Sequence, residues 1–339
     1  MKKCYTKQVP LVSVVMSVYN TPEKLLREAI ESILNQTYTN LEFLIVDDGS
    51  DVMTAKIIRE YKDTRIHVIP NETNIGLTKS LNIAFSQAKG KYIARMDADD
   101  ISYPKRLAWQ VKFMEKNKDI SVVGGWTRSN SSIQKYYGSN TSEYRKVCMM
   151  FENAGISHPT ALFRKSFLVE NNILYDEEFK KAQDYKMWTD ILKYGKIGVV
   201  PRVVLFYRVH PKQISASSST EKYSQKYYDR LIRVQLLENL CSTLKENEKE
   251  QLLTKEQLVI SPEETIQLIE KLKEANKTEK EYNQKILEFE LFNFWKRYIK
   301  IYIAQKGIKS DIVMQGYNMN FLNVRYILQK VLVSYRKLG

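Results

Sequence analysis

Hydrophobic and polar positions follow two alternating periods over the first hundred residues. Short, nearly uninterrupted apolar runs predict buried strands at 11–19, 41–48, 65–71 and 91–97. Segments with apolar residues at helical spacing separate these runs, at 25–36, 52–63 and, after a glycine-led turn, within 74–90. Regular alternation of strand and helix implies right-handed crossovers. The pattern therefore predicts an α/β fold with a doubly wound, mainly parallel sheet.

Polar side chains stand where three of these strands end, and ligands of doubly wound sheets bind at the carboxyl ends of the strands. The residues in question are Ser17 and Asn20, Asp47 and Asp48, and Asp97 and Asp99. We expect all of them to line one crevice. Asp97 and Asp99 are two residues apart on an extended segment, so both carboxylates point to the same side and can share one Mg²⁺ or Mn²⁺ ion. Such an ion would neutralise a diphosphate, for which no glycine-rich phosphate loop is present.

Aspartate also has structural uses at turns and helix caps. Asp100 precedes a segment, 104–117, with a helical pattern, and we expect it to cap that helix. Of the neighbours Asp47 and Asp48, one is expected to cap the turn and the other to touch a ligand. For Asp97 and Asp99 we favour the functional interpretation.

Four motifs together resemble the successive signatures of family-2 glycosyltransferases with the GT-A fold. They are "VSVVMSVYN", "ESILNQTYTNLEFLIVDDGSD", "NIGLTKSLNIAF" and "KYIARMDADDISYPKRL". The resemblance extends from residue 10 to about 215. It implies a catalytic domain at 1–215, with a nucleotide-sugar half at about 1–100 and an acceptor half at about 101–215.

The resemblance also implies roles on the donor side of the site. Asp97 and Asp99 would be the first and last acids of the DxD motif, which coordinates Mg²⁺ or Mn²⁺ on a nucleotide diphosphate. Ser17 and Asp48 would contact uridine or ribose. Lys79 lies near the position where many members carry an arginine that faces the diphosphate, although "GLTKSLN" departs from the family pattern there.

On the acceptor side, the resemblance assigns the catalytic base to Asp184. The family's base is an aspartate in an "ED" pair before an aromatic residue, and here Gln183 replaces the glutamate. Asp184 could also cap the helix that follows, which is compatible with catalysis. His210, in "YRVH", would approach the metal or the diphosphate, with a loop histidine bonded to backbone as the equal alternative. His158 is expected to serve packing.

Composition and charge limit the remaining possibilities. The chain has 339 residues and a formal net charge of +14. Its three cysteines are far apart and in no metal-ligand spacing, which argues against disulfides and zinc and favours a reducing compartment. No apolar stretch approaches the ~20 residues that span a bilayer. We therefore expect a cytoplasmic protein, peripheral on the inner face of the cell membrane.

The pattern after residue 215 is helical, and we assign 216–339 to a helical C-terminal region with a basic aromatic tail. Residues 291–339 hold nine Lys or Arg and a single acid, a net charge of +8. Packing on the catalytic domain, attachment to an anionic membrane and nucleic-acid binding are the alternatives. The last lacks a recognition motif, so no nucleic-acid partner is expected. Membrane attachment suits 291–304, where one helical face gathers Leu291, Trp295, Tyr298, Ile299 and Tyr302.

These observations predict a metal-dependent, inverting glycosyltransferase. It would move a hexose or N-acetylhexosamine from a UDP-sugar to a hydroxyl of a growing, lipid-linked surface glycan. A nucleotidyltransferase that makes a nucleotide-sugar is the alternative enzyme, but it would need a glycine-rich, basic N-terminal signature that the chain lacks. A non-catalytic nucleotide-binding module is disfavoured by the intact set Asp97, Asp99 and Asp184.

Overall fold

The computed structural model describes residues 9–130, 132–134, 141–209, 223–254 and 256–306. The chain divides into two units between Leu236 and Leu237. The boundary expected at 215 falls among the residues outside this description and stays a prediction. The first unit contains the sheet and the candidate site, and the second is helical.

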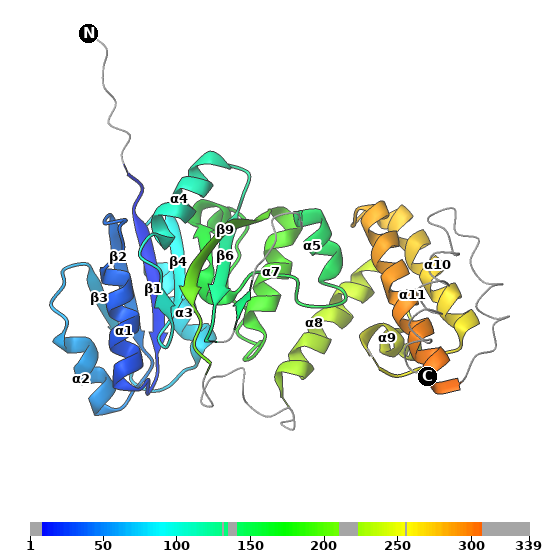
Figure 1. Ribbon diagram of the computed structural model, residues 1–339, viewed down its shortest axis with the longest axis horizontal. Coiled ribbons are helices and arrows are strands. Elements are labelled where there is room, and N and C mark those ends of the chain that lie inside the picture. Colours follow the sequence, from blue (N-terminus) through cyan, green and yellow to red (C-terminus); the bar gives the residue numbers. More distant parts are fainter. Residues whose placement is uncertain (1–8, 131, 135–140, 210–222, 255, 307–339) are drawn as a thin grey trace, which may run out of the picture. The chain divides into compact units, whose positions relative to one another are not determined.

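The first half of the first unit is a run of β–α units (Figure 1). Its strands are parallel and lie in the order β3-β2-β1-β4. In chain order the elements are β1 (Val12–Val18), α1 (Glu23–Leu34), β2 (Leu41–Asp47), α2 (Val52–Glu60), β3 (Ile66–Pro70), α3 (Leu77–Gln87) and β4 (Tyr92–Asp97). Each strand and helix predicted from hydrophobic periodicity is present.

The second half of the sheet continues in the order β8-β6-β9-β5 and is mixed. β8 is antiparallel to both β4 and β6, whereas β6 and β9 are parallel. The elements are β5 (Ile101–Ser102), α4 (Arg106–Lys116), β6 (Val122–Arg128), β7 (Ile133–Gln134), α5 (Ser142–Cys148), the 3₁₀ turn η1 (His158–Thr160), β8 (Leu162–Arg164), α6 (Lys165–Glu170), α7 (Gln183–Tyr194) and β9 (Ile197–Phe206). The predicted α/β fold is confirmed.

Strand residues alternate between two cores on opposite faces of the sheet. Val14 and Met16 join the core formed with α1, α2 and α4, and Val15 joins the core formed with α3, α6 and α7. This period-2 alternation continues along β4, where Ala94 and Met96 belong to the first core. Arg95 and Asp97, at the intervening positions, therefore point to the face that α7 covers.

Arg164 connects the two halves of the sheet through its side-chain hydrogen bonds. β8 is only three residues long, so few backbone pairs connect β4 to β6 through it. The Arg164 guanidinium donates to the carbonyls of Ile120, Met114 and Asn117 at 3.1–3.2 Å and to the Tyr92 hydroxyl at 3.2 Å. One side chain thereby ties the end of α4 to β4 and β8.

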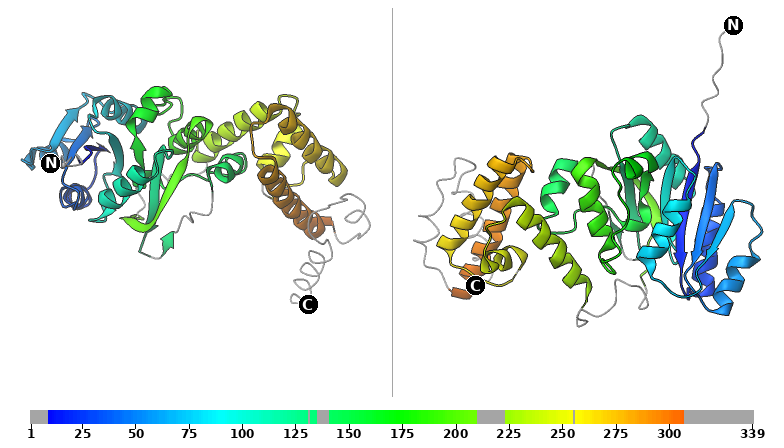
Figure 2. Two further views of the ribbon diagram at one scale, coloured as in Figure 1. Left: turned by 90° about the horizontal axis from the view of Figure 1, so that it is seen from above. Right: turned by 180° about the vertical axis from the view of Figure 1, so that it is seen from behind.

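The second unit is built from helices that bury apolar side chains against one another. α8 (Gln225–Leu240) leads into it, followed by α9 (Glu246–Leu253), α10 (Pro262–Glu279) and α11 (Gln284–Lys306). A capping box between Ser261 and Glu264 begins α10. α10 and α11 run side by side in all views (Figure 2). The Asn276 side chain bridges their turn through both backbone groups of Tyr282.

The face of 291–304 that we assigned to a membrane surface is instead part of this packing. Leu291, Trp295 and Tyr298 are buried, and the Tyr298 hydroxyl donates to the Ile260 carbonyl at 2.7 Å. That prediction is wrong for these residues because a buried interhelical face and a membrane-facing one have the same period. Within the described ranges, no helix combines the length and hydropathy that crossing a membrane requires. The basic tail at 307–339 lies outside the described residues.

Candidate active site

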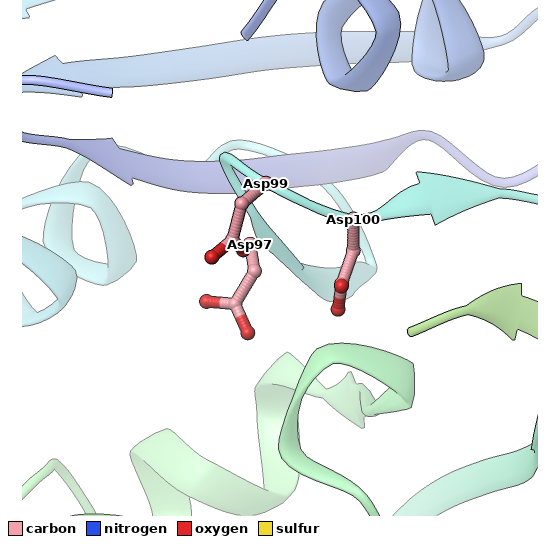
Figure 3. A group of neighbouring side chains, drawn as sticks. All are labelled: Asp97, Asp99 and Asp100. Carbon is pink, nitrogen blue, oxygen red and sulfur yellow. The ribbon is translucent and has the colours of Figure 1, made fainter. Parts of the chain in front are cut away.

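Three carboxylates gather on the turn after β4. One oxygen each of Asp97, Asp99 and Asp100 lies within 4.8 Å of the others, and the side chains point to the same side of the turn (Figure 3). The strand register brings neighbouring strand ends to this point, since Ser17 of β1 pairs with Asp97, and Val18 pairs with Asp47 of β2. The acids at the carboxyl ends of β2 and β4 therefore lie on the same edge of the sheet as Ser17, and the crevice expected there stays a prediction.

Two buried arginines offset the negative charges of these carboxylates. Arg95 forms an ion pair with Asp97 and is almost fully buried. Arg106, at the start of α4, is completely buried and donates to the Arg95 carbonyl at 2.7 Å. Burial and the nearby Arg95 charge lower the pKa of Arg106 to about 9, and the charges of Asp100 and Asp97 oppose that shift. The two partly exposed acids Asp97 and Asp99 and the buried Asp100 are therefore charge-compensated by buried arginines.

Arg208, in the segment after β9, holds the acidic turn in place. Its backbone N–H donates to Asp100 Oδ1 and its Nη1 to the Asp99 carbonyl, both at 2.9 Å. Its Nη2 is paired with Glu28 of α1. The expectation that Asp100 caps the following helix is wrong, because α4 begins after Lys105 without a side-chain cap. His210, two residues after Arg208, lies outside the described residues, so its metal role stays a prediction.

The donor set on this turn fits a hard divalent cation. Carboxylate oxygens are the ligands that Mg²⁺ and Mn²⁺ prefer. Asp100 Oδ2 is buried, and no hydrogen-bond partner for it exists among the described residues. Burial and the charge of Asp97 raise the pKa of Asp100 to about 8. A bound cation would offset this electrostatic cost, so the residues present are compatible with a metal held by Asp97 and Asp99, with Asp100 beside them.

The acids after β2 organise the loops around the predicted nucleoside site. Asp48 is buried, and its carboxylate accepts from the Asn71 side chain and from the backbone N–H groups of Ile75 and Gly76, each at 2.9 Å. It therefore orders the loop that leads into α3. Asp47 Oδ1 accepts from the Ser50 N–H at 3.0 Å. Both acids thus stabilise turns, and the contact of Asp48 with uridine or ribose stays a prediction.

The other predicted donor contacts surround the same edge of the sheet. Ser17 is partly exposed near the end of β1. Asn20 has a positive φ of 47°, and its Oδ1 accepts from the Asp51 N–H at 2.8 Å, which joins the loops after β1 and β2. Lys79 is exposed on the first turn of α3. These positions agree with a donor crevice, and nothing in the structure tests their individual roles.

Asp184 lies in the first turn of α7 and interacts electrostatically with Arg95, the ion-pair partner of Asp97. Burial raises the pKa of Asp184 above its ordinary value, and hydrogen bonds from the Tyr185 N–H and the Asn153 side chain and the Arg95 charge oppose that rise. The Arg95 charge therefore acts both on the predicted base and on Asp97 of the acidic cluster. A carboxylate with a raised pKa is suited to accept a proton near neutral pH.

His158 is buried and serves packing, as expected. Its Nε2 is 2.6 Å from the Tyr175 hydroxyl, and its ring makes edge contacts with Tyr175 and Trp188. Burial and the Arg95 charge hold the pKa of His158 well below its usual range. A neutral imidazole at this depth fixes the Tyr175 side chain.

Sequence reasoning missed the arginines and the contribution of α8. Arg95 carries a recognisable signal, because a charge within an apolar strand, two residues before Asp97, must share its face of the sheet. Arg208 lies in the "YRVH" motif, which was interpreted for His210 alone, and its partners Asp99, Asp100 and Glu28 are more than 100 residues away. Arg106 carries no such signal. Asp229 on α8 interacts electrostatically with Asp184, again across a long sequence separation.

Comparison with known proteins agrees with this arrangement. Residues 13–171 match the family model described as glycosyl transferase family 2. An uncharacterized glycosyltransferase of Methanocaldococcus jannaschii is 37% identical over 227 residues, which cover 65% of this chain and 78% of that protein. The chain belongs to glycosyl transferase family 2. The present chain is also 30% identical over 223 residues to the Escherichia coli UDP-Glc:alpha-D-GlcNAc-diphosphoundecaprenol beta-1,3-glucosyltransferase WfgD. The match covers 65% of this chain and 85% of WfgD.

Solved structures agree with the fold of this glycosyltransferase. The crystal structure of S. aureus TarS residues 1–349 in complex with UDP-GlcNAc has a TM-score of 0.59 and 20% identity, covering 87% of this chain and 92% of that one. The predicted GT-A fold with a helical C-terminal region is thereby confirmed.

Proposed function

We propose that this family-2 glycosyltransferase transfers a hexose or N-acetylhexosamine from a UDP-sugar, with inversion, to a hydroxyl of a growing lipid-linked surface glycan. The observation that carries the proposal is the link through Arg95, which forms an ion pair with Asp97 of the acidic cluster and acts electrostatically on Asp184. We expect a donor diphosphate held at the cluster and an acceptor hydroxyl at Asp184 to lie close enough to react.

The identity of the donor and the acceptor rests on the relatives. WfgD is named for a UDP-glucose donor and an acceptor sugar on diphosphoundecaprenol, and TarS is described in complex with UDP-GlcNAc. A lipid-linked acceptor would bring the reaction to a membrane surface. These features support a UDP-sugar donor and a lipid-linked acceptor for this chain.

In the proposed reaction, Asp184 accepts the proton of the acceptor hydroxyl as its oxygen bonds to the anomeric carbon of the donor. The bond from that carbon to the β-phosphate oxygen breaks, and its electron pair leaves with UDP. A divalent cation, when bound by Asp97 and Asp99, neutralises charge on the diphosphate. Arg95 holds Asp97 in position, and Arg208 holds the turn that carries Asp99. One base suffices, and the attack from the face opposite UDP gives inversion.

A donor screen tests the proposal directly. The protein is incubated with Mn²⁺, a lipid-linked oligosaccharide fraction and, in turn, UDP-glucose, UDP-galactose, UDP-N-acetylglucosamine or a GDP-sugar, and release of free nucleotide diphosphate is measured. We expect UDP release that depends on the acceptor. Pyrophosphate release from UTP and a sugar 1-phosphate would instead indicate a nucleotidyltransferase.

Asp99→Ala tests the metal site. Because this change removes a carboxylate from the cluster, we expect it to abolish Mn²⁺-dependent UDP binding and turnover while the fold is retained. Isothermal titration of UDP with and without Mn²⁺, alongside circular dichroism, provides the measurement. Normal metal-dependent turnover in this variant would contradict the assignment. Glu170→Ala, a change of an exposed acid at the end of α6, is the control.

A further inference from the structure

The first turn of α8 is hydrogen-bonded to the residue that precedes α7. Gln225, the first residue of α8, accepts the N–H of Ala182 through its Oε1 at 3.2 Å. Its Nε2 donates to Asp229 Oδ1, one turn further along α8, at 3.0 Å. A chain of two hydrogen bonds therefore runs from Asp229 through Gln225 to the N-cap of α7. Asp184 is two residues after that N-cap.

Ala182 is held in a strained backbone conformation. Its φ is 57°, in the left-handed region that a residue with a Cβ adopts at an energetic cost. Its carbonyl accepts the first backbone bond of α7, from the Lys186 N–H at 3.1 Å. Strain of this kind persists only where neighbouring groups fix it. Gln225 fixes the N–H of Ala182 and so sets the direction in which α7 begins.

α8 is rigid enough for this task because its inner face is part of the core. Tyr228 and Ile232 are buried, and the Tyr228 ring lies 5.7 Å from that of Phe179, just before α7. The Arg233 Nε donates to the Met150 carbonyl at 3.1 Å. The hydroxyl of Tyr185, the neighbour of Asp184, donates to the Met149 carbonyl. α7 and α8 are thus anchored to the same short segment.

Asp229, the partner of Gln225, also interacts electrostatically with the proposed base, Asp184. Asp229 is half-buried, and burial and the charge of Asp184 raise its pKa to about 6, while Gln225 and Arg233 oppose the shift. Around Asp184, the other titratable groups are Arg95 of β4 and Tyr175, before α7. The carboxylates of Asp184 and Asp229 therefore lie within electrostatic range of each other.

We propose that Gln225 and Asp229 are positioning residues for glycosyl transfer: they fix the left-handed N-cap at Ala182 so that Asp184 faces the acceptor hydroxyl. This inference rests on the proposed function, in which Asp184 is the base. It gives the beginning of α8 an indirect role in catalysis, which acts through the backbone of Ala182. Loss of the contact should slow the chemical step and leave donor binding unchanged.

The test compares three variants of the full chain. Gln225→Met keeps the size of the side chain and removes both hydrogen bonds. The double variant Gln225→Glu/Asp229→Asn rebuilds both with roles exchanged, because the new carboxylate accepts from Ala182 N–H and from the new amide at 229. Lys226→Met places the same substitution on the exposed side of the same turn and is the control.

The readouts are donor affinity, by titration with UDP and Mn²⁺, and the single-turnover transfer rate. We expect Gln225→Met to lower the rate about 10- to 100-fold, since a misplacement of about 1 Å can cost 10²-fold, with donor affinity unchanged. The double variant should recover most of the rate, and Lys226→Met should match the parent.

Three results would overturn the inference: a parental rate in Gln225→Met, a double variant as slow as Gln225→Met, or a loss of donor affinity that accounts for the slower rate. If Gln225→Met does not fold, the double variant compared with Asp229→Leu makes the same comparison. An inactive parent protein would instead reject the proposed function, so the two failures are distinguishable.

Discussion

Asp184 is the residue on which the proposed chemistry depends, and Asp184→Asn is its sharpest test. Asparagine keeps the shape and the hydrogen bond to Tyr185 N–H but cannot accept a proton at neutral pH. We expect the single-turnover transfer rate to fall by roughly 10²–10⁴-fold, with donor affinity little changed. Rapid-quench transfer assays and UDP-sugar titration measure the two quantities. Near-parental transfer would assign the base to another acid, and lost donor affinity would make Asp184 a binding residue.

The half-buried carboxyl of Asp229 predicts a pH-dependent effect on stability. Its pKa in the folded protein is raised to about 6, so the folded state binds the proton more tightly than the unfolded state does. Stability is therefore lost as pH rises from about 4 to about 6 and stays lower above that range. Asp229→Asn removes this effect and keeps an acceptor for Gln225. We expect the variant to exceed the parent in stability at pH 8 and to match it below pH 4, in urea denaturation at both pH values.

Asp63→Asn is the control of opposite sign for that experiment. Hydrogen bonds from the Arg65 side chain and backbone lower the pKa of Asp63 to about 2. Its charged form is thus favoured in the folded state, and the stability that it contributes is present above about pH 4 and lost as pH falls through about 2. This variant should be less stable than the parent at pH 8. If Asp229→Asn and Asp63→Asn changed stability at pH 8 in the same direction and by the same amount, burial of Asp229 would have no energetic cost.

Whether a residue of the site could be predicted depends on how far away in the sequence its interaction partner lies. Asp97 and Asp99 follow an apolar strand directly, so local pattern was enough to place them at a crevice. The use of Asp100 could not be predicted, because its partner is Arg208, 108 residues away. Gln225 and Ala182 are likewise 43 residues apart. Sequence periodicity reports which face a side chain occupies and carries no information about such long-range partners.

At the scale of elements, the parallel half of the sheet was predictable and the mixed half was not. β1, β2 and β4 alternate between two cores, so both faces are apolar and the runs are conspicuous. β8 and β5 are three and two residues long, too short to show a period. Their places are set by backbone pairing with β4, β6 and β9. The face of α11 was misassigned for a related reason, since amphipathicity shows that a face will be covered and does not show what covers it.

The packing of α7 predicts that Gly155 tolerates no side chain. A Cβ at this position would lie 2.0 Å from Cδ1 of Trp188, which is fully buried and stacked on Phe163. Gly155→Ala should destabilise the catalytic unit by about 1–3 kcal/mol and alter the near-ultraviolet circular dichroism of the buried indole. Gly76→Ala is the comparison, because open space surrounds that site and its cost comes from its φ of 91° alone. A Gly155→Ala protein with parental stability and spectrum would contradict the packing shown for α7.

For the whole molecule, the basic C-terminal sequence beyond α11 predicts attachment to anionic membranes. Residues 307–339 contain five Lys or Arg and one acid. Truncation after Lys306 should therefore weaken binding to vesicles that contain an anionic lipid, and binding of the full chain should fall as salt rises. Cosedimentation with anionic and neutral vesicles at two salt concentrations provides the measurement. Salt-independent binding, or no binding by the full chain, would contradict the prediction.

The position of the truncation matters because α11 is a core element of the second unit. Ending the chain at Glu290 would remove the buried Leu291, Trp295 and Tyr298 and expose their partners on α10. Loss of vesicle binding in that shorter protein would reflect unfolding as much as loss of charge. The protein that ends at Lys306 keeps all of α11, so it separates the two causes.

The short strand β8 also has a consequence for how the chain is produced in the cell. β4 is complete at residue 97, whereas β8, its second neighbour, begins at Leu162, roughly 65 residues later in synthesis. Until β8 emerges from the ribosome, β4 presents an open backbone edge that can pair with another nascent chain. A fragment that ends before Leu162 would keep this edge permanently and would tend to aggregate. The first half of the sheet therefore depends on later residues to cover the edge of β4, and synthesis of β8 removes that exposed edge.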